Sequence, residues 1–120
     1  MRDARRRGRL SHPLGIIGSM RADTLSFSAA VRAVAGEARR MGLTVPAFRS
    51  PPGLTGADRT IRRRRGTLVV AIRIRDRTFA DVVADVVEGV LVANSVPRGA
   101  DLRIRRRLLA AVEPMARQAA

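Results

Sequence analysis

The chain has 120 residues and carries 24 positive against 10 acidic side chains, so its formal net charge is +14. Every positive side chain is an arginine, which indicates either an acidic partner such as nucleic acid or a solvated surface produced by GC-rich coding. Cysteine is absent and His12 is the only histidine, so disulfides and thiolate metal sites are excluded. We therefore predict a non-enzymatic protein with no catalytic or metal-binding residues, no cofactor and no small-molecule substrate.

The length allows one domain at most. No apolar run approaches the ~20 residues that cross a membrane, so no membrane partner is expected. A small protein without disulfides is typical of the cytoplasm, which is the predicted location. The only aromatic residues are three phenylalanines, so the core is expected to be aliphatic and small, and a homodimer would add buried area.

Residues 1–20 are predicted to form a basic, disordered arm, and residues 21–120 a single α+β domain. The arm carries a cluster of arginines suited to phosphate contact: Arg5, Arg6, Arg7 and Arg9. An alternative left open is that translation starts at Met20 and the arm is not made.

A first helix is predicted over residues 24–41, with Asp23 or Thr24 as its N-cap and Gly42 as its left-handed stop. Its apolar stripe is formed by Phe27, Val31, Val34, Ala38 and Met41. Residues 43–58 contain three prolines and two glycines, so they are predicted to be an extended crossover rather than a helix or a central strand.

Residues 59–75 predict a β-hairpin with a tight turn at Arg65-Gly66. In this register Ile61 lies opposite Val70 on the buried face. Four arginines are then expected to share the opposite face: Arg62, Arg64, Arg73 and Arg75. The segment 59–77 holds eight arginines against Asp76 alone, which is half of the net charge of the chain.

Two further helices are predicted over residues 78–94 and 101–113. The first begins at Asp76 or Thr78, ends near Asn94, and has a valine-rich apolar face opposite an acidic stripe. The second is predicted to be capped by Asp101, with an apolar side formed by Leu102, Leu108, Leu109 and Val112. The fold class is thus a two-layer α+β unit in the order helix, hairpin, helix, helix.

Two functional hypotheses follow. In the first, the hairpin contacts the backbone of DNA or RNA, because a two-stranded ribbon fits a major groove and arginine binds phosphate with two hydrogen bonds. Few aromatic residues are present, which disfavours base stacking and favours duplex or structured nucleic acid. The candidate contacts are Arg62, Arg64, Arg73 and Arg75 on the hairpin, and Arg103, Arg105, Arg106 and Arg107 on the last helix.

In the second hypothesis the chain is a protein–protein adaptor or a homodimerisation module, and the arginines only reflect coding bias. Its interface would be the helix 78–94, through Val82, Val83, Val86, Val87 and Val90 with Asp81, Asp85 and Glu88. The acidic stripe could instead pair with the arginines of the last helix, within one chain or across a dimer.

Overall fold

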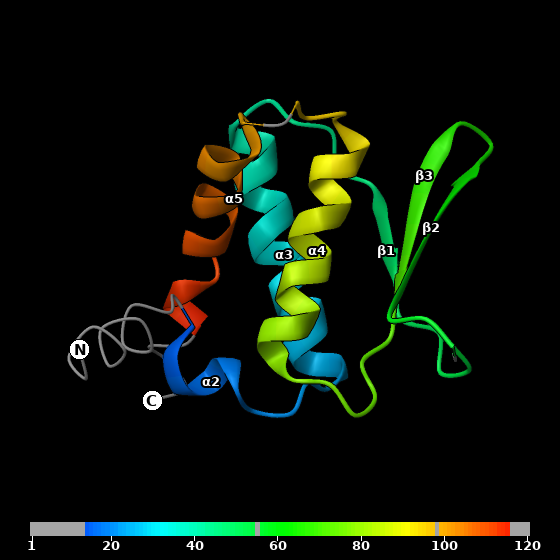
Figure 1. Cartoon of the computed structure of the whole chain (residues 1–120), viewed down its shortest axis with the longest axis vertical. Helices are drawn as coiled ribbons and strands as arrows, with labels where there is room; N and C mark the ends of the chain where they lie inside the picture. Colours follow the sequence, from blue (N-terminus) through cyan, green and yellow to red (C-terminus); the bar gives the residue numbers. More distant parts are fainter. Residues whose placement is uncertain (1–13, 55, 98, 116–120) are drawn as a thin grey trace.

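The computed structural model describes residues 14–54, 56–97 and 99–115. The helices within these ranges are α2 (Gly15–Gly18), α3 (Thr24–Arg40), α4 (Phe79–Ala93) and α5 (Asp101–Ala110), and the strands are β1 (Ala47–Arg49), β2 (Arg59–Arg64) and β3 (Thr67–Ile72). Figure 1 shows the helices gathered on one side and the sheet on the other. The predicted α+β class is confirmed, as is the order of helix, hairpin, helix and helix.

Helix α3 begins and ends where the local sequence signals predict. The Asp23 carboxylate accepts from the backbone amide of Ser26 at 2.7 Å, and the Ser26 hydroxyl accepts from the amide of Asp23 at 2.9 Å, which is a reciprocal cap. At the other end Gly42 has φ +75°, and the amide of Leu43 donates to the carbonyl of Ala38. This is a Schellman motif, which needs a residue that tolerates the left-handed region.

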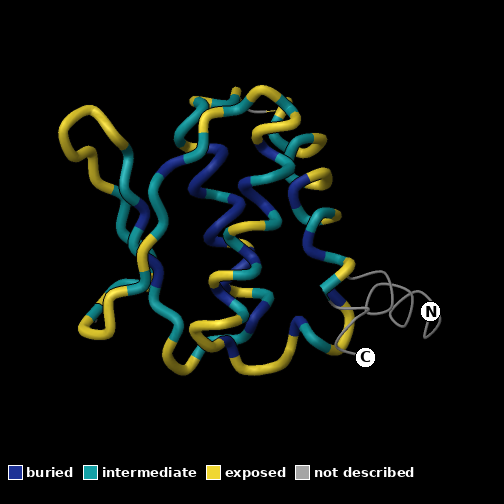
Figure 2. The backbone as a smooth tube through the Cα atoms, turned by 180° about the vertical axis from the view of Figure 1, so that it is seen from behind, coloured by how far each residue is buried: buried dark blue, intermediate teal, exposed yellow. Residues whose placement is uncertain are grey.

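Helix α4 lies between the sheet and the other helices. Its N-cap Thr78 accepts from the amide of Asp81, and its C-cap is Asn94, as expected. The helix packs against β3 on one side and against α3, α5 and α2 elsewhere. Figure 2 shows the buried colour running along it. This central position explains why a helix rich in β-branched residues is stable, because tertiary burial outweighs weak helix propensity.

The sheet has the strand order β1-β3-β2, with β1 parallel and β2 antiparallel to β3. The predicted hairpin register is confirmed, since Ile61 pairs with Val70. Arg65 and Gly66 both have positive φ, +50° and +80°, as a type I′ turn requires. Strand β3 ends at Ile72, three residues earlier than the predicted hairpin.

Strand β1 lies in the segment that the sequence predicted as a crossover. It pairs only at residues 47–49, opposite Val69 to Ala71 of β3. Prolines at 46 and 51 bracket it, which an edge strand tolerates. A Cβ on Gly89 of α4 would come within 2.8 Å of the Phe48 ring, so the missing side chain at Gly89 lets Phe48 pack directly on the helix.

The ordered structure begins before residue 21, so the predicted disordered arm is corrected for residues 14–20. Leu14 is buried in the core, and α2 packs against α4. The carbonyl of Met20 accepts from the amide of Phe79 at 2.7 Å, and the amide of Ala22 donates to the carbonyl of Arg77 at 2.9 Å. The arm arginines and His12 lie outside the described residues.

Helix α5 differs from its prediction at its start. Its N-cap is Ala100, with no side-chain cap bond, and Asp101 is the first helical residue instead. Leu108 and Val112 are buried as expected, whereas Leu102 is 58% exposed. The residues of α5 that pack in or against the core are Ile104, Leu108 and Leu109, and Leu102 in its first turn is not among them.

Candidate nucleic-acid interface

Four consecutive arginines form the end of the β2–β3 hairpin, and we call them the tip arginines: Arg62, Arg63, Arg64 and Arg65. All four are exposed, and among the described residues no carboxylate lies within 4 Å of any of them. Arg63 Nη1 donates a long hydrogen bond to the carbonyl of Gly66, at 3.5 Å. The guanidinium groups of the tip arginines therefore remain available to hydrogen-bond acceptors outside the chain.

The hairpin end projects away from the helices. Strand β1 pairs with β3 only from Val69 to Ala71, so the ribbon beyond Val69 has no third strand beside it. Figure 1 shows this end leaning away from the top of α4. Arginines on both faces of the ribbon, Arg62 and Arg64 on one and Arg63 on the other, are exposed at the tip.

The tip arginines are distributed over both faces of the ribbon. Arg62 pairs with Val69 and Arg64 with Thr67, on the face turned away from α4. Arg63 pairs with Leu68, on the face that continues into the buried residue Val70. Successive side chains of a strand point to opposite faces, so the run of arginines presents charge on each side.

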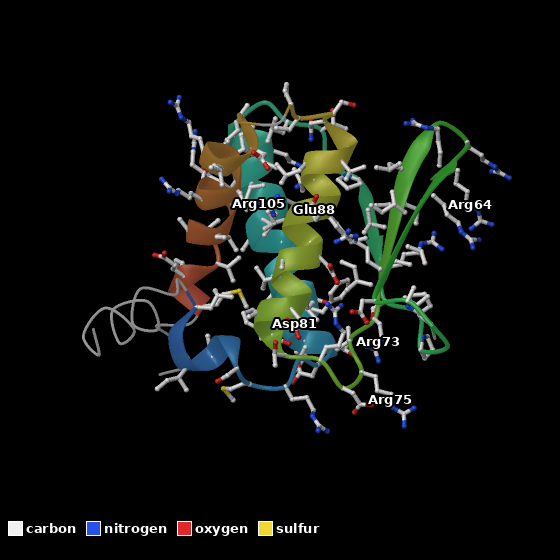
Figure 3. The ribbon with its side chains drawn as sticks, in the orientation of Figure 1. Arg64, Arg73, Arg75, Asp81, Glu88 and Arg105 are labelled. Atoms are coloured by element: carbon white, nitrogen blue, oxygen red, sulfur yellow. The ribbon has the colours of Figure 1, made fainter. Side chains whose placement is uncertain are left out.

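The predicted grouping of Arg73 and Arg75 with Arg62 and Arg64 does not occur. Figure 3 shows Arg64 near the hairpin tip and Arg73 and Arg75 at the opposite end of the sheet. The chain leaves the sheet after Ile72, so neither residue lies on the β3 strand. Arg75 is 88% exposed beside Asp76, while Arg73 is held in an ion pair.

That ion pair belongs to a network at the base of the hairpin. Arg73 Nη2 lies 2.6 Å from Asp58 Oδ1, and the amide of Arg73 donates to the Asp58 carbonyl. Asp85 of α4 accepts from Arg59 at 2.8 Å and from Arg77 at 2.6 Å. The hydrogen bond from Arg73 and the charge of Arg77 hold the pKa of the Asp58 carboxyl below its ordinary value. All three arginines are thus engaged by carboxylates, and two of them, Arg59 and Arg77, bind α4 through Asp85.

The arginines of α5 are divided between paired and free positions. Arg105 lies 2.9 Å from Glu88, so the predicted pairing with the acidic stripe occurs within the chain. Arg107 lies 2.6 Å from Glu37, a partner that the sequence did not suggest. Arg103 and Arg106 are exposed and have no carboxylate partner among the described residues. Helix α5 lies on the far side of the helices from the hairpin, so the two arginine clusters do not form one surface (Figure 1).

The valine face of α4 forms the chain's own core. Its five candidate interface valines are fully buried: Val82, Val83, Val86, Val87 and Val90. The acidic stripe is not one solvated face either, because Asp85 is only 8% exposed and is covered by the base of the hairpin. Asp81 remains exposed and Glu88 is engaged by Arg105. This fold therefore leaves little of the predicted α4 interface accessible to a partner.

Besides Arg63 and Arg65 of the tip, Arg49 was not among the contacts predicted from the sequence. Arg49 of β1 is exposed on the outer face of the sheet, in the row of Ala71 and Thr60. The same face carries Arg62 one row farther along. Only the position of β1 relates Arg49 to the hairpin, and the short strand gave no signal in the sequence.

No aromatic ring accompanies the basic residues. Phe27 and Phe79 are buried in the core, and Phe48 packs against Gly89 on the inner face of the sheet. Since proteins that read unstacked bases use exposed rings, the hairpin has the groups for phosphate contact and lacks those for base stacking.

We also searched the described part of the chain for metal sites, membrane-spanning helices and pockets. It contains no group of three or more residues from His, Cys, Asp and Glu that could hold a metal ion. No helix there is long and apolar enough to cross a membrane. An open pocket of about 650 Å³ lies where the proline-rich loop meets the start of α3, and includes Asp23, Pro51, Arg73 and Arg75. Asp23 caps α3 and Arg73 is paired with Asp58, so both are already engaged.

Comparison with protein-family models, with curated proteins and with solved structures gives no match to this chain.

Proposed function

We propose that this chain is a small basic protein that binds the phosphate backbone of nucleic acid through the tip arginines. The observation that carries the proposal is the difference between neighbouring arginines on one hairpin. At its base Arg59, Arg73 and Arg77 are each engaged by a carboxylate, whereas the four tip arginines are exposed and have no carboxylate partner within the described ranges.

Like charges on adjacent residues of a strand end repel one another in the free protein. A polyanion relieves this repulsion and forms charge-assisted hydrogen bonds with each guanidinium, which offers a planar fork of donors matched to phosphate. Contacts of this kind are mainly electrostatic and carry little sequence information. A nucleic-acid partner is consistent with the cytoplasmic location expected from the cysteine-free composition.

The test is a gel-mobility or anisotropy titration with a nucleic-acid duplex at several salt concentrations. For a backbone binder, log K is expected to fall with log salt by about 0.9 for each duplex phosphate contacted. The double variant Arg62→Glu/Arg64→Glu is expected to weaken binding at least tenfold and to reduce the slope.

The matched control is Arg103→Glu/Arg106→Glu, which makes the same change in net charge on α5. Its effect is expected to be small, because charges far beyond the ~8 Å screening length at physiological salt interact weakly. Equal loss in the two variants would mean that net charge alone drives binding. Absence of salt-dependent binding in the unmodified protein would end the proposal.

A further inference from the structure

We propose that the nucleic acid bound by the hairpin is a B-form DNA duplex and that the ribbon enters its major groove end-on. Arg62 and Arg64 would face one phosphate wall of the groove and Arg63 the other. This inference rests on the proposed function and specifies its ligand.

The first support is the two-sided charge of the ribbon. Arg64 pairs with Thr67 on the outer face, and Arg63 pairs with Leu68 on the inner face, so the two side chains start from opposite faces of the ribbon. A flat anionic surface would meet only one of these faces. A groove has phosphates on both sides, so it uses both sets of arginines at once.

The second support is the free length of the ribbon. The portion beyond Val69 has no neighbouring strand from β1, and it ends in a two-residue turn without added bulk. The major groove of B-DNA, about 12 Å wide, admits a two-stranded ribbon. The major groove of A-form RNA is deep and narrow and excludes side chains, so an RNA duplex offers no equivalent site.

The third support is the chemistry at the tip. Single-stranded ligands are held by stacking on aromatic rings, and the three phenylalanines of the chain all lie in or against the core. Arginine instead binds phosphate or the O6 and N7 edge of guanine in the major groove. The hairpin thus carries groups suited to a duplex.

A ligand lying flat on the sheet would contact a different set of arginines from a duplex that receives the ribbon in its groove, so substitutions can distinguish the two geometries. If the ligand lay flat on the outer face of the sheet, it would contact Arg49, Arg62 and Arg64 and leave Arg63 unused. Groove insertion instead uses Arg63 and Arg64 alike and leaves Arg49 at the base of the ribbon.

The experiment measures binding of a 20-base-pair DNA duplex, an RNA duplex of the same sequence and the single DNA strand, with Arg63→Gln, Arg64→Gln and Arg49→Gln tested beside the unmodified protein. We expect the DNA duplex to bind at least tenfold more tightly than the other two ligands at moderate salt. Arg63→Gln and Arg64→Gln should each reduce the salt slope by about one contact, and Arg49→Gln should leave it unchanged.

Equal affinity for the RNA duplex would overturn the choice of B-form DNA. If Arg49→Gln weakened DNA binding and Arg63→Gln did not, groove insertion would be overturned and the ligand would lie on the outer face of the sheet. In both cases salt-dependent binding survives, so the proposed function stands. If none of the three ligands binds, the proposed function itself fails. Thermal melting of each variant confirms that the fold is retained.

Discussion

Arg77 and Asp85 form an almost completely buried ion pair, with Nη1 2.6 Å from Oδ2 and side chains only 8% and 11% exposed. Arg77 lies in the loop between β3 and α4, and Asp85 of α4 also pairs with Arg59 of β2, so Asp85 joins the helix to the sheet and to this loop. Arg77 also donates to the backbone carbonyl of Arg73, which helps to satisfy the guanidinium away from water. The pair fixes the base of the hairpin whose tip is free.

Removal of the Asp85 charge is expected to destabilise the protein strongly. Asp85→Asn removes the 2.6 Å counter-charge of the buried Arg77 and leaves it only Asp58, at 4.0 Å. Loss of one partner of a buried ion pair costs about 3–5 kcal/mol. The matched control is Glu88→Gln, which breaks the half-exposed pair with Arg105 and should cost at most about 1 kcal/mol. Urea unfolding measures both. Equal small losses would indicate that water reaches Arg77.

Substitution of Gly89 by a residue with a side chain is expected to destabilise the protein. Gly89→Ala places a Cβ within 2.8 Å of the Phe48 ring, and overpacking of this kind costs about 1–3 kcal/mol. Addition of Phe48→Ala should remove the closest contact and leave Val70 Cγ2 at 3.1 Å, so the double variant should lose less stability than the sum of the two single changes. Gly36→Ala on α3 meets only the flexible Arg40 guanidinium, 3.8 Å away, and should gain about 0.5–1 kcal/mol. Urea unfolding measures these changes. If Gly36→Ala lowered the free energy of unfolding as much as Gly89→Ala, close packing against Phe48 would not explain the effect at Gly89.

Substitutions in the hairpin turn are expected to change stability according to how well the new residue tolerates positive φ. Gly66 has φ +80°, so Gly66→Ala should destabilise the hairpin by about 1 kcal/mol. Arg65 has φ +50°, a region that asparagine adopts readily, so Arg65→Asn should stabilise the turn. Thermal melting and amide exchange across β2 and β3 measure the effect. Equal responses to the two changes would rule out the type I′ turn.

Stability is expected to fall in acid. Hydrogen bonds from Arg107 and then Arg40 lower the pKa of Glu37, and hydrogen bonds with Ser26 lower that of Asp23. A carboxyl with a lowered folded-state pKa stabilises the fold fully above its unfolded-state pKa, and this contribution disappears as pH falls through the folded value. The melting temperature should therefore decline below about pH 5. Glu37→Gln should make that decline shallower, and an unchanged profile would show that Glu37 takes no part.

The segment before α3 is expected to be necessary for stability. A chain beginning at Leu14 retains the buried leucine and α2, whereas one beginning at Met20 lacks both. Loss of a buried leucine side chain typically costs about 2–5 kcal/mol. Comparison of the two truncations with the single variant Leu14→Ala separates the side chain from the helix. Equal stability of all three chains with the full chain would show that Leu14 is dispensable.

The sequence predicted those parts of the fold that have strong local signals. Asp23 and Gly42 mark the ends of α3, and the alternation around Val70 gives both the hairpin and its register. Strand β1 has three residues, and its partners lie more than 20 residues away, so nothing local marks it. The spacing of Asp81, Asp85 and Glu88 on α4 indicates a polar face, but only the docked base of the hairpin determines that Asp85 within it is buried.

The candidate site was predicted only in part for the same reason. The exposure of Arg62 and Arg64 follows from strand alternation, and it is observed. The loss of Arg73 from that group depends on Asp58, which lies 15 positions earlier and approaches it only in the folded chain. Charge counts along a sequence locate arginines, but they do not show which ones find carboxylates.

Strand β2 is an edge of the sheet, and its outward backbone groups would otherwise offer a template for another copy to join. The arginines along β2 oppose such pairing, because the β2 strand of a second copy would bring its own arginines next to the first set and the like charges would repel. Neutralisation of these arginines would remove the repulsion. Concentrated protein mixed with an equivalent of polyanion is then expected to turn cloudy, and to clear when added salt releases the polyanion from the arginines. Aggregation would therefore depend on whether the arginines are occupied.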